Sequence, residues 1–133
     1  MPKKENRMEL PHIPKEHLNH FIRGYFDGDG CISYGFYKRK NRNTKSFLVM
    51  TRFISSSRQF LEAISKKLSV YAEMSHGSMT KYPGYYNLIY SKNDSVKLSN
   101  YMYKNTKNSL FLERKFIKFQ KIFIILGINA LGN

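Results

Sequence analysis

The sequence contains a single cysteine, few acidic residues and no long apolar run, and each shortage excludes a class of protein. Cys31 alone cannot form an internal disulfide or a zinc site built from several thiolates. The longest apolar candidate, residues 122–131, falls short of the ~18 residues that span a bilayer. Polar and basic residues follow Met1, which is not the pattern of a signal peptide. We therefore expect an intracellular protein of a reducing compartment without a membrane partner.

Basic residues outnumber acidic ones, with 23 Lys and Arg against nine Asp and Glu and a formal net charge of +14. Such an excess repels itself in a compact chain and favours a polyanionic partner. Nucleic acid fits this best. An anionic membrane surface is the weaker alternative, because no spanning segment accompanies the charge. The length of 133 residues fits one domain with a single core.

The hydrophobic periodicity predicts the element order α-β-β-α-β-β-α-α. The expected helices are Lys15 to the glycines at 28–30, Ser57–Val70, Asp94–Lys104 and Glu113–Leu126, and the expected strands are Cys31–Lys40, Ser46–Ser55, Glu73–Lys81 and Tyr85–Ser91. Residues 1–14 carry three prolines and are interpreted as a basic N-terminal arm, and residues 15–133 as one domain. This order indicates an α+β fold in which helices cover one face of a sheet.

Two of the few aspartates, Asp27 and Asp29, lie together in the segment Asp-Gly-Asp-Gly that ends the first helix. Carboxylates are unfavourable near the negative pole of a helix, so a divalent cation there would offset their charge. A plain turn explains the same composition equally well. A calcium loop of the EF-hand type does not, because its twelfth position would be Lys38 where glutamate is required. Gly24 and Gly28 share a helical face and would allow a second helix to approach closely.

The segment Ile22–Gly30 resembles the nine-residue signature of LAGLIDADG homing endonucleases, with Gly24, Asp27, Asp29 and Gly30 at matching places. Residues 101–103 and 111–116 resemble a later stretch typical of bacterial and phage members, so the resemblance extends from about Pro11 to Phe123. It implies the LAGLIDADG homing endonuclease fold, an antiparallel four-stranded saddle-shaped sheet with helices on one face.

The resemblance also implies a catalytic centre. Asp29 would be a metal ligand with help from the Gly28 carbonyl, and Asp27 would have a structural role. The implied cofactor is Mg²⁺, which Mn²⁺ can replace, whereas Ca²⁺ binds without supporting cleavage. Lys115 matches a catalytic lysine near the attacking solvent, with a solvated helix charge as the alternative. After the second strand either Ser56 or Arg58 would contact that solvent, and both stay open.

One motif supplies half of an active site, so the resemblance implies a homodimer packed through Phe21, Gly24 and Gly28. Closed twofold assembly is the commonest way to pair equal halves. Arg23, which replaces a small residue of the signature, is expected to point away from the helix pair. Residues 8–14 resemble the segment before the second motif of longer, two-motif members, so the chain as half of such a protein is the alternative.

The sheet face away from the helices would lie along DNA. Alternation on the strands and the basic loops select the DNA-binding residues Ser33, Tyr37, Arg39, Lys40, Arg42, His76, Ser78, Thr80, Tyr85 and Asn87. The opposite set, Ile32, Tyr34, Phe36, Leu88 and Tyr90, is expected beneath the helices. An ordinary solvated sheet face is the competing interpretation, and residues 47–53 stay unassigned because they are apolar on both faces.

Together these features predict a Mg²⁺-dependent, sequence-specific endonuclease that cuts double-stranded DNA as a homodimer and serves intron or intein mobility. An RNA-binding intron maturase, with intron RNA as partner, and a non-cutting DNA-binding protein of the same fold are the alternatives, because aromatic residues also stack on unpaired bases. The presence of both Asp29 and Lys115 favours cleavage.

Overall fold

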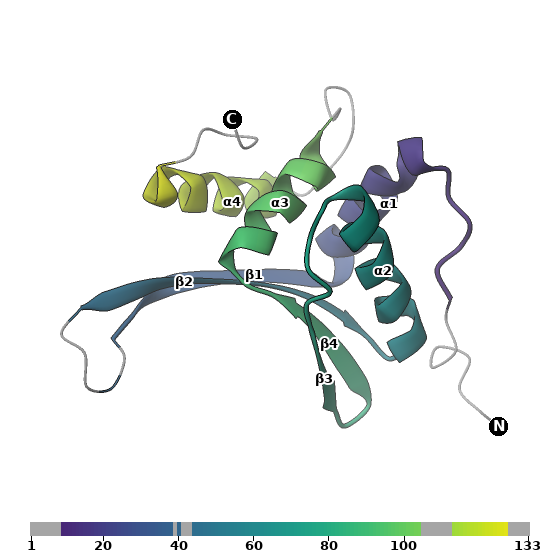
Figure 1. The fold of residues 1–133 in the computed structure, drawn as a ribbon, viewed down its shortest axis with the longest axis horizontal. Coiled ribbons are helices and arrows are strands. Elements are labelled where there is room, and N and C mark those ends of the chain that lie inside the picture. The colour runs from purple at the N-terminus through teal and green to yellow at the C-terminus, as the bar shows by residue number, and fades with distance from the viewer. Residues whose placement is uncertain (1–8, 39, 41–43, 105–112, 128–133) are drawn as a thin grey trace.

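The computed structural model describes residues 9–38, 40, 44–104 and 113–127. Within these ranges, four helices lie on one face of a four-stranded antiparallel sheet (Figure 1). The elements are α1 (Lys15–Asp29), β1 (Gly30–Lys38), β2 (Lys45–Ser55), α2 (Arg58–Tyr71), β3 (Ser78–Tyr82), β4 (Tyr85–Tyr90), α3 (Lys92–Tyr103) and α4 (Glu113–Leu126). The predicted fold class and element order are confirmed.

The strand order is β1-β2-β4-β3, and the register of the strands decides which side chains share a face. Ile32 lies opposite Thr51, which in turn lies opposite Tyr90. All three are buried, and partners across a ladder point to the same side of a sheet. This side carries the core, which α1 completes with the predicted stripe of Leu18, Ile22 and Phe26.

The other face of the sheet carries none of the described helices (Figure 1). The sheet bends away from the helices at both ends, through the β1–β2 hairpin on one side and the β3–β4 hairpin on the other. The helix-free face is therefore concave. None of the described helices is long and apolar enough to cross a bilayer.

Two predictions about the sheet are wrong. Phe36 shares the helix side of β1 but is 58% exposed, because the β1–β2 hairpin extends beyond the helices, and its ring contacts that of Phe47. The third strand begins at Ser78 rather than at Glu73. Glu73 and Gly77 have φ values of 55° and 71°, which interrupt an extended chain, while the intervening Met74 inserts into the core.

The described part of the N-terminal arm lies against the domain. Leu10 and Ile13 pack on the core, and the Gln59 side chain donates a hydrogen bond of 3.1 Å to Glu9. Residues 1–8 of the predicted arm lie outside the described residues.

Candidate active site and nucleic-acid interface

The last turn of α1 presents one carboxylate to solvent. Asp29 ends the helix and is exposed beside the equally exposed Gly28. The following residue must be small, because a Cβ on Gly30 would lie 2.2 Å from the Phe26 ring. This close approach lets the helix pass directly into β1. No hydrogen bond or ion pair to another described residue holds the Asp29 carboxylate.

Lys115 on α4 closes the same end of α1. Its ammonium donates hydrogen bonds to the carbonyl oxygens of Phe26, Asp27 and Gly30 at 2.7, 3.0 and 2.7 Å. The Asp27 carbonyl belongs to the last turn of α1, the Phe26 carbonyl also accepts the backbone N–H of Gly30, and the Gly30 carbonyl lies at the start of β1. Three acceptors require all three N–H groups of the charged form. Burial lowers the pKa of Lys115, while the neighbouring Asp27 carboxylate opposes that shift. Lys115 therefore caps the signature helix, and the Gly28 carbonyl is not among its acceptors.

Replacing Lys115 with methionine should lower the free energy of unfolding by about 2 kcal/mol, because partly buried carbonyl groups lose a charged donor. Lys118→Met, on an exposed position of the same helix, is the matched control and should change it by less than ~0.5 kcal/mol. Urea unfolding with an unchanged denaturant slope measures both variants. Equal losses in the two variants would contradict the cap.

Asp27 points into its own chain rather than outward. It is partly buried, and it acts electrostatically on Arg23 and Tyr103. Burial raises the pKa of the Tyr103 hydroxyl, and Asp27 adds to that rise. Arg23 is buried and donates to the Met102 carbonyl at 2.9 Å, with its other close contact at the His20 ring. The two aspartates of the signature therefore differ in environment, and Asp29 is the one that an incoming ligand can reach.

The outer side of α1 has an open strip of backbone. A Cβ added at Gly24 or Gly28 would meet nothing within 4 Å, so the fold of the single chain does not require glycine at either place. Phe21 borders this strip and is half-buried against Phe60, with ring centroids 6.4 Å apart. Arg23 is turned toward α3 and leaves the strip uncovered. The three predicted interface residues thus share one side of α1.

The donor set at this helix end suits a hard cation only in part. Among the described residues there is no group of three or more His, Cys, Asp or Glu side chains that could hold a metal ion. One chain offers the Asp29 carboxylate and the Gly28 carbonyl, both oxygen donors. Mg²⁺ is commonly held by one or two carboxylates together with phosphate oxygens and water. The residues present therefore fit half of a magnesium site that a second copy and a phosphate would complete.

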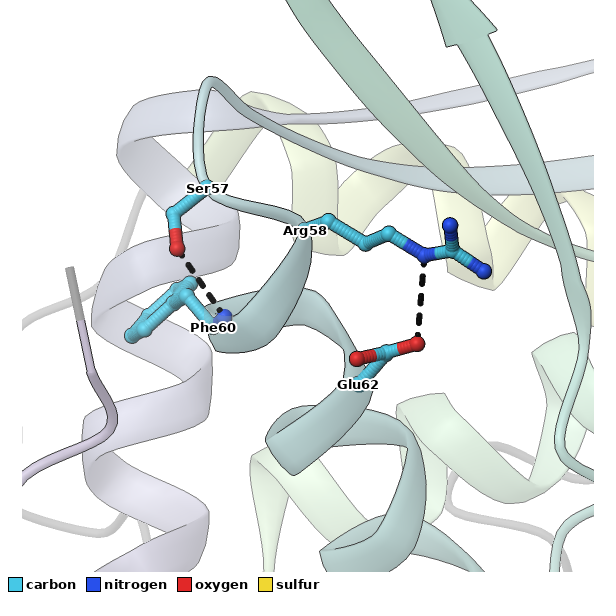
Figure 2. Close-up of polar contacts among 4 residues, drawn as sticks. All are labelled: Ser57, Arg58, Phe60 and Glu62. Atoms are coloured by element: carbon cyan, nitrogen blue, oxygen red, sulfur yellow. Dashed lines mark hydrogen bonds and ion pairs between the residues drawn. The ribbon is translucent and has the colours of Figure 1, made fainter. Parts of the chain in front are cut away.

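The segment after β2 is built mainly to start α2. Ser57 is the N-cap, and its side chain accepts a hydrogen bond from the Phe60 amide at 3.1 Å (Figure 2). Arg58 extends along the helix to Glu62, with a distance of 3.2 Å between Nε and the carboxylate. Ser56 is half-buried next to the cap. The contact of Ser56 or Arg58 with active-site solvent stays a prediction.

The helix-free face collects most of the predicted DNA-binding residues. Ser33, Tyr37, Ser78 and Tyr85 are exposed there and Thr80 is half-buried, as the register places them. Lys40 is exposed in the turn of the β1–β2 hairpin, whereas Arg39 and Arg42 lie outside the described residues. Tyr82, which was not predicted, stacks on Tyr85 with ring centroids 5.1 Å apart.

Two predicted DNA-binding residues occupy different environments from the expected ones. His76 precedes β3 and its carbonyl accepts from Ser65, so it does not belong to the strand ladder. Asn87 has the expected register but is 3% exposed, and its Oδ1 is buried without a hydrogen-bond partner among the described residues. Its neighbours in the ladder, Ile54 and Thr80, flank it on the curved sheet.

The residues that the sequence left unassigned are those of β2. Its outward set alternates with the buried Val49, Thr51 and Phe53, and comprises Ser46, Leu48, Met50, Arg52 and Ile54. Arg52 contacts the Cys31 sulfur opposite it at 3.4 Å. Buried Val49, Thr51 and Phe53 already share one alternation. The sequence therefore contained the alternation of a strand with one buried face, but the exposed Leu48 and Met50 made the other face apolar as well.

Comparisons with known proteins identify the family and the fold. Residues 16–102 match the family model of the LAGLIDADG-like domain. The crystal structure of the homing endonuclease I-TnaI superposes with a TM-score of 0.60 at 19% identity, over 90% of this chain and 76% of that one. The LAGLIDADG meganuclease I-AabMI bound to uncleaved DNA gives 0.59 at 19% identity, over 82% and 38%. The homing endonuclease I-CvuI, in complex with the I-CreI target in the presence of 2 mM Mg and with the DNA not cleaved, gives 0.52 at 16% identity, over 66% and 55%. No curated protein matches the chain.

Proposed function

Because the chain belongs to the family of LAGLIDADG-like domains, we propose that it is a sequence-specific endonuclease that hydrolyses phosphodiester bonds of double-stranded DNA and serves intron or intein mobility. The observation that carries this proposal is the exposed Asp29 at the end of α1, where the helix runs directly into β1 of the concave sheet. A duplex lying along the helix-free face would bring its backbone to this helix end. The net charge of +14 supports a polyanionic ligand.

The proposed cofactor is Mg²⁺ held by Asp29 and the Gly28 carbonyl. When bound, the ion supplies a water of lowered pKa and stabilises the leaving oxygen of the phosphate. The chain's own part is to hold the two oxygen donors in place. Lys115 does this from within, since it fixes the carbonyls on either side of Gly28 and lowers the negative charge that accumulates at the end of α1. In this arrangement Lys115 positions the ligands, and a direct role of Lys115 toward the attacking solvent stays a prediction for an activity assay.

The proposed assembly is a homodimer through α1. The strip at Gly24 and Gly28 lets a second helix approach to backbone contact, and twofold symmetry would place two copies of Asp29 at one centre. The alternative is that the chain is one half of a longer two-motif protein, because it supplies one signature. I-AabMI, of which this chain covers 38%, shows that relatives of greater length exist.

Substitutions at Gly24 distinguish the stability of the single chain from the stability of the proposed dimer. Gly24→Ala should raise the stability of the single chain by ~0.5–1 kcal/mol, since its Cβ meets nothing within 4 Å. Gly24→Leu should weaken dimerisation about 30-fold or more, because two copies of an added side chain overpack the interface. Lys66→Leu, exposed on α2, controls for added apolar surface. Urea unfolding measures the stability of Gly24→Ala, and light scattering across the micromolar range measures the dimerisation of wild type, Gly24→Leu and Lys66→Leu. A wild-type monomer, with and without DNA, would contradict the homodimer.

Incubation of the protein with a pooled DNA library and Mg²⁺, followed by sequencing of new ends, tests the activity itself. The proposal expects cuts at one recurring sequence, and an equimolar Ca²⁺ reaction should enrich the same sequence without cutting it. Tight binding to structured RNA with no enriched DNA would instead favour the maturase. Enriched DNA without cuts in Mg²⁺ or Mn²⁺ would favour the non-cutting DNA-binding protein.

A further inference from the structure

The outward side of the β1–β2 hairpin holds an apolar patch that neither the signature nor the core requires. Tyr37, Leu48 and Met50 are 54%, 44% and 42% exposed on the helix-free face, and they are here called the hairpin patch. Leu48 lies opposite Gly35, and Met50 lies opposite Ser33. A Cβ on Gly35 would come within 3.2 Å of the Tyr37 ring, so that ring occupies the glycine's space and lies beside Leu48. The patch is therefore continuous across both strands.

Its surroundings are basic. No Asp or Glu occurs between Gly30 and Ser55, while Lys38, Lys40 and Lys45 are exposed at the end of the hairpin and Arg52 lies on the same face. Apolar side chains framed by cations match a ligand with phosphates at its edges and apolar groups at its centre. The major groove of DNA has this chemistry, because each thymine presents a methyl group between two phosphate backbones.

The spacing of the patch fits the same ligand. Leu48 and Met50 are two residues apart on an antiparallel strand, so their side chains project to one face ~6.8 Å from each other. Stacked base pairs rise ~3.4 Å along each strand of the helix, so two steps cover the same distance. A ribbon following the groove can therefore set each side chain against a base pair, with one pair between them.

We propose that Leu48 and Met50 recognise the 5-methyl groups of two thymines two base pairs apart in each half of the DNA target. This inference rests on the proposed function and adds the base identity that this part of the face selects. The proposal also predicts which nucleic acid binds more tightly. RNA has uracil in place of thymine, so the hairpin patch favours DNA over RNA of the same sequence.

The test uses the site enriched from the library, with thymines replaced one at a time by deoxyuridine, which removes only the methyl group. Affinity is measured in Ca²⁺. Loss of one buried methyl contact should weaken binding about fourfold, the factor that corresponds to ~0.8 kcal/mol, and roughly fifteenfold when both halves carry the change. Two positions per half, separated by one base pair, should respond in the wild type. In Leu48→Asn the deoxyuridine replacement at one of these positions should no longer change the affinity, and in Met50→Gln the replacement at the other position should no longer change it.

Val70→Thr is the matched control, because Val70 is 68% exposed on α2 and away from this face, and it should keep the deoxyuridine response. A bound site on which no deoxyuridine weakens binding, or on which the variants respond like the wild type, overturns the hairpin patch assignment alone. Failure to enrich any DNA overturns the proposed function as well. Binding to anionic phosphatidylserine vesicles that both variants lose, with DNA affinity unchanged, would assign the patch to a lipid surface and also overturn the inference.

Discussion

Asp29→Asn is expected to lower DNA cleavage by a factor of about 10³ or more while DNA binding persists. Metal ions commonly contribute several kcal/mol to the stabilisation of a transition state, and each ~1.4 kcal/mol is a factor of ten in rate. The change removes one ligand charge from each half of the dimer and barely alters shape. Because Asp29 is exposed and makes no hydrogen bond or ion pair with another described residue, loss of its charge should not change the stability of the fold.

Binding should persist or become tighter in this variant, since two negative charges fewer face the phosphates. The experiment pairs a binding titration in Ca²⁺ with a cleavage assay in Mg²⁺. Asp94→Asn is the matched control, because Asp94 lies at the start of α3 and bonds Ser75 instead of the helix end. It should cut at the wild-type rate. If Asp29→Asn cuts DNA at the same rate as the control, Asp29 is not a metal ligand. The Asp-Gly-Asp-Gly segment is then a plain turn, which its composition also allows.

The elements could be predicted from the sequence because their signals are local. The stripe of Leu18, Ile22 and Phe26 and the glycines at 28–30 determine where α1 lies and where it stops, and α4 was predicted with its observed ends, Glu113 and Leu126. The start of β3 was not predictable, because the chain before it is held by Met74 in the core and by a left-handed Gly77. Neither of these two features can be predicted from the alternation of apolar and polar residues within β3.

The candidate site could likewise be predicted from the sequence only in part. The signature predicted which carboxylate would be a metal ligand, but not what surrounds it. That Lys115 binds carbonyls at the end of α1 and the start of β1 depends on α4 packing beside a junction that lies 85 or more residues earlier in the chain, which no spacing rule reveals. The exposed Phe36 and the buried Asn87 likewise result from how far the sheet extends and bends. In β2 buried and exposed side chains alternate, but both faces of the strand carry apolar residues. Only the cross-strand partners of β2 show which face packs against the core.

The affinity for DNA should fall by about 10³ or more between roughly 50 mM and 200 mM salt, because each phosphate that the protein neutralises releases a condensed counterion. The site of this effect can be located with single charges. Lys40 is exposed in the turn of the β1–β2 hairpin, so Lys40→Gln should reduce the slope of log affinity against log salt by about 1 per half, or about 2 for the dimer.

Lys66→Gln removes the same charge from α2, on the helix side of the sheet, and should leave that slope unchanged. Both variants have the same net charge, so a difference between them cannot come from the overall field of a chain at +14. Titrations of each protein on the same duplex at four or more salt concentrations give the slopes. If the two slopes fall equally, the attraction belongs to the whole surface. If only Lys66→Gln lowers the slope, DNA lies against the helices, and the concave sheet is not the binding face.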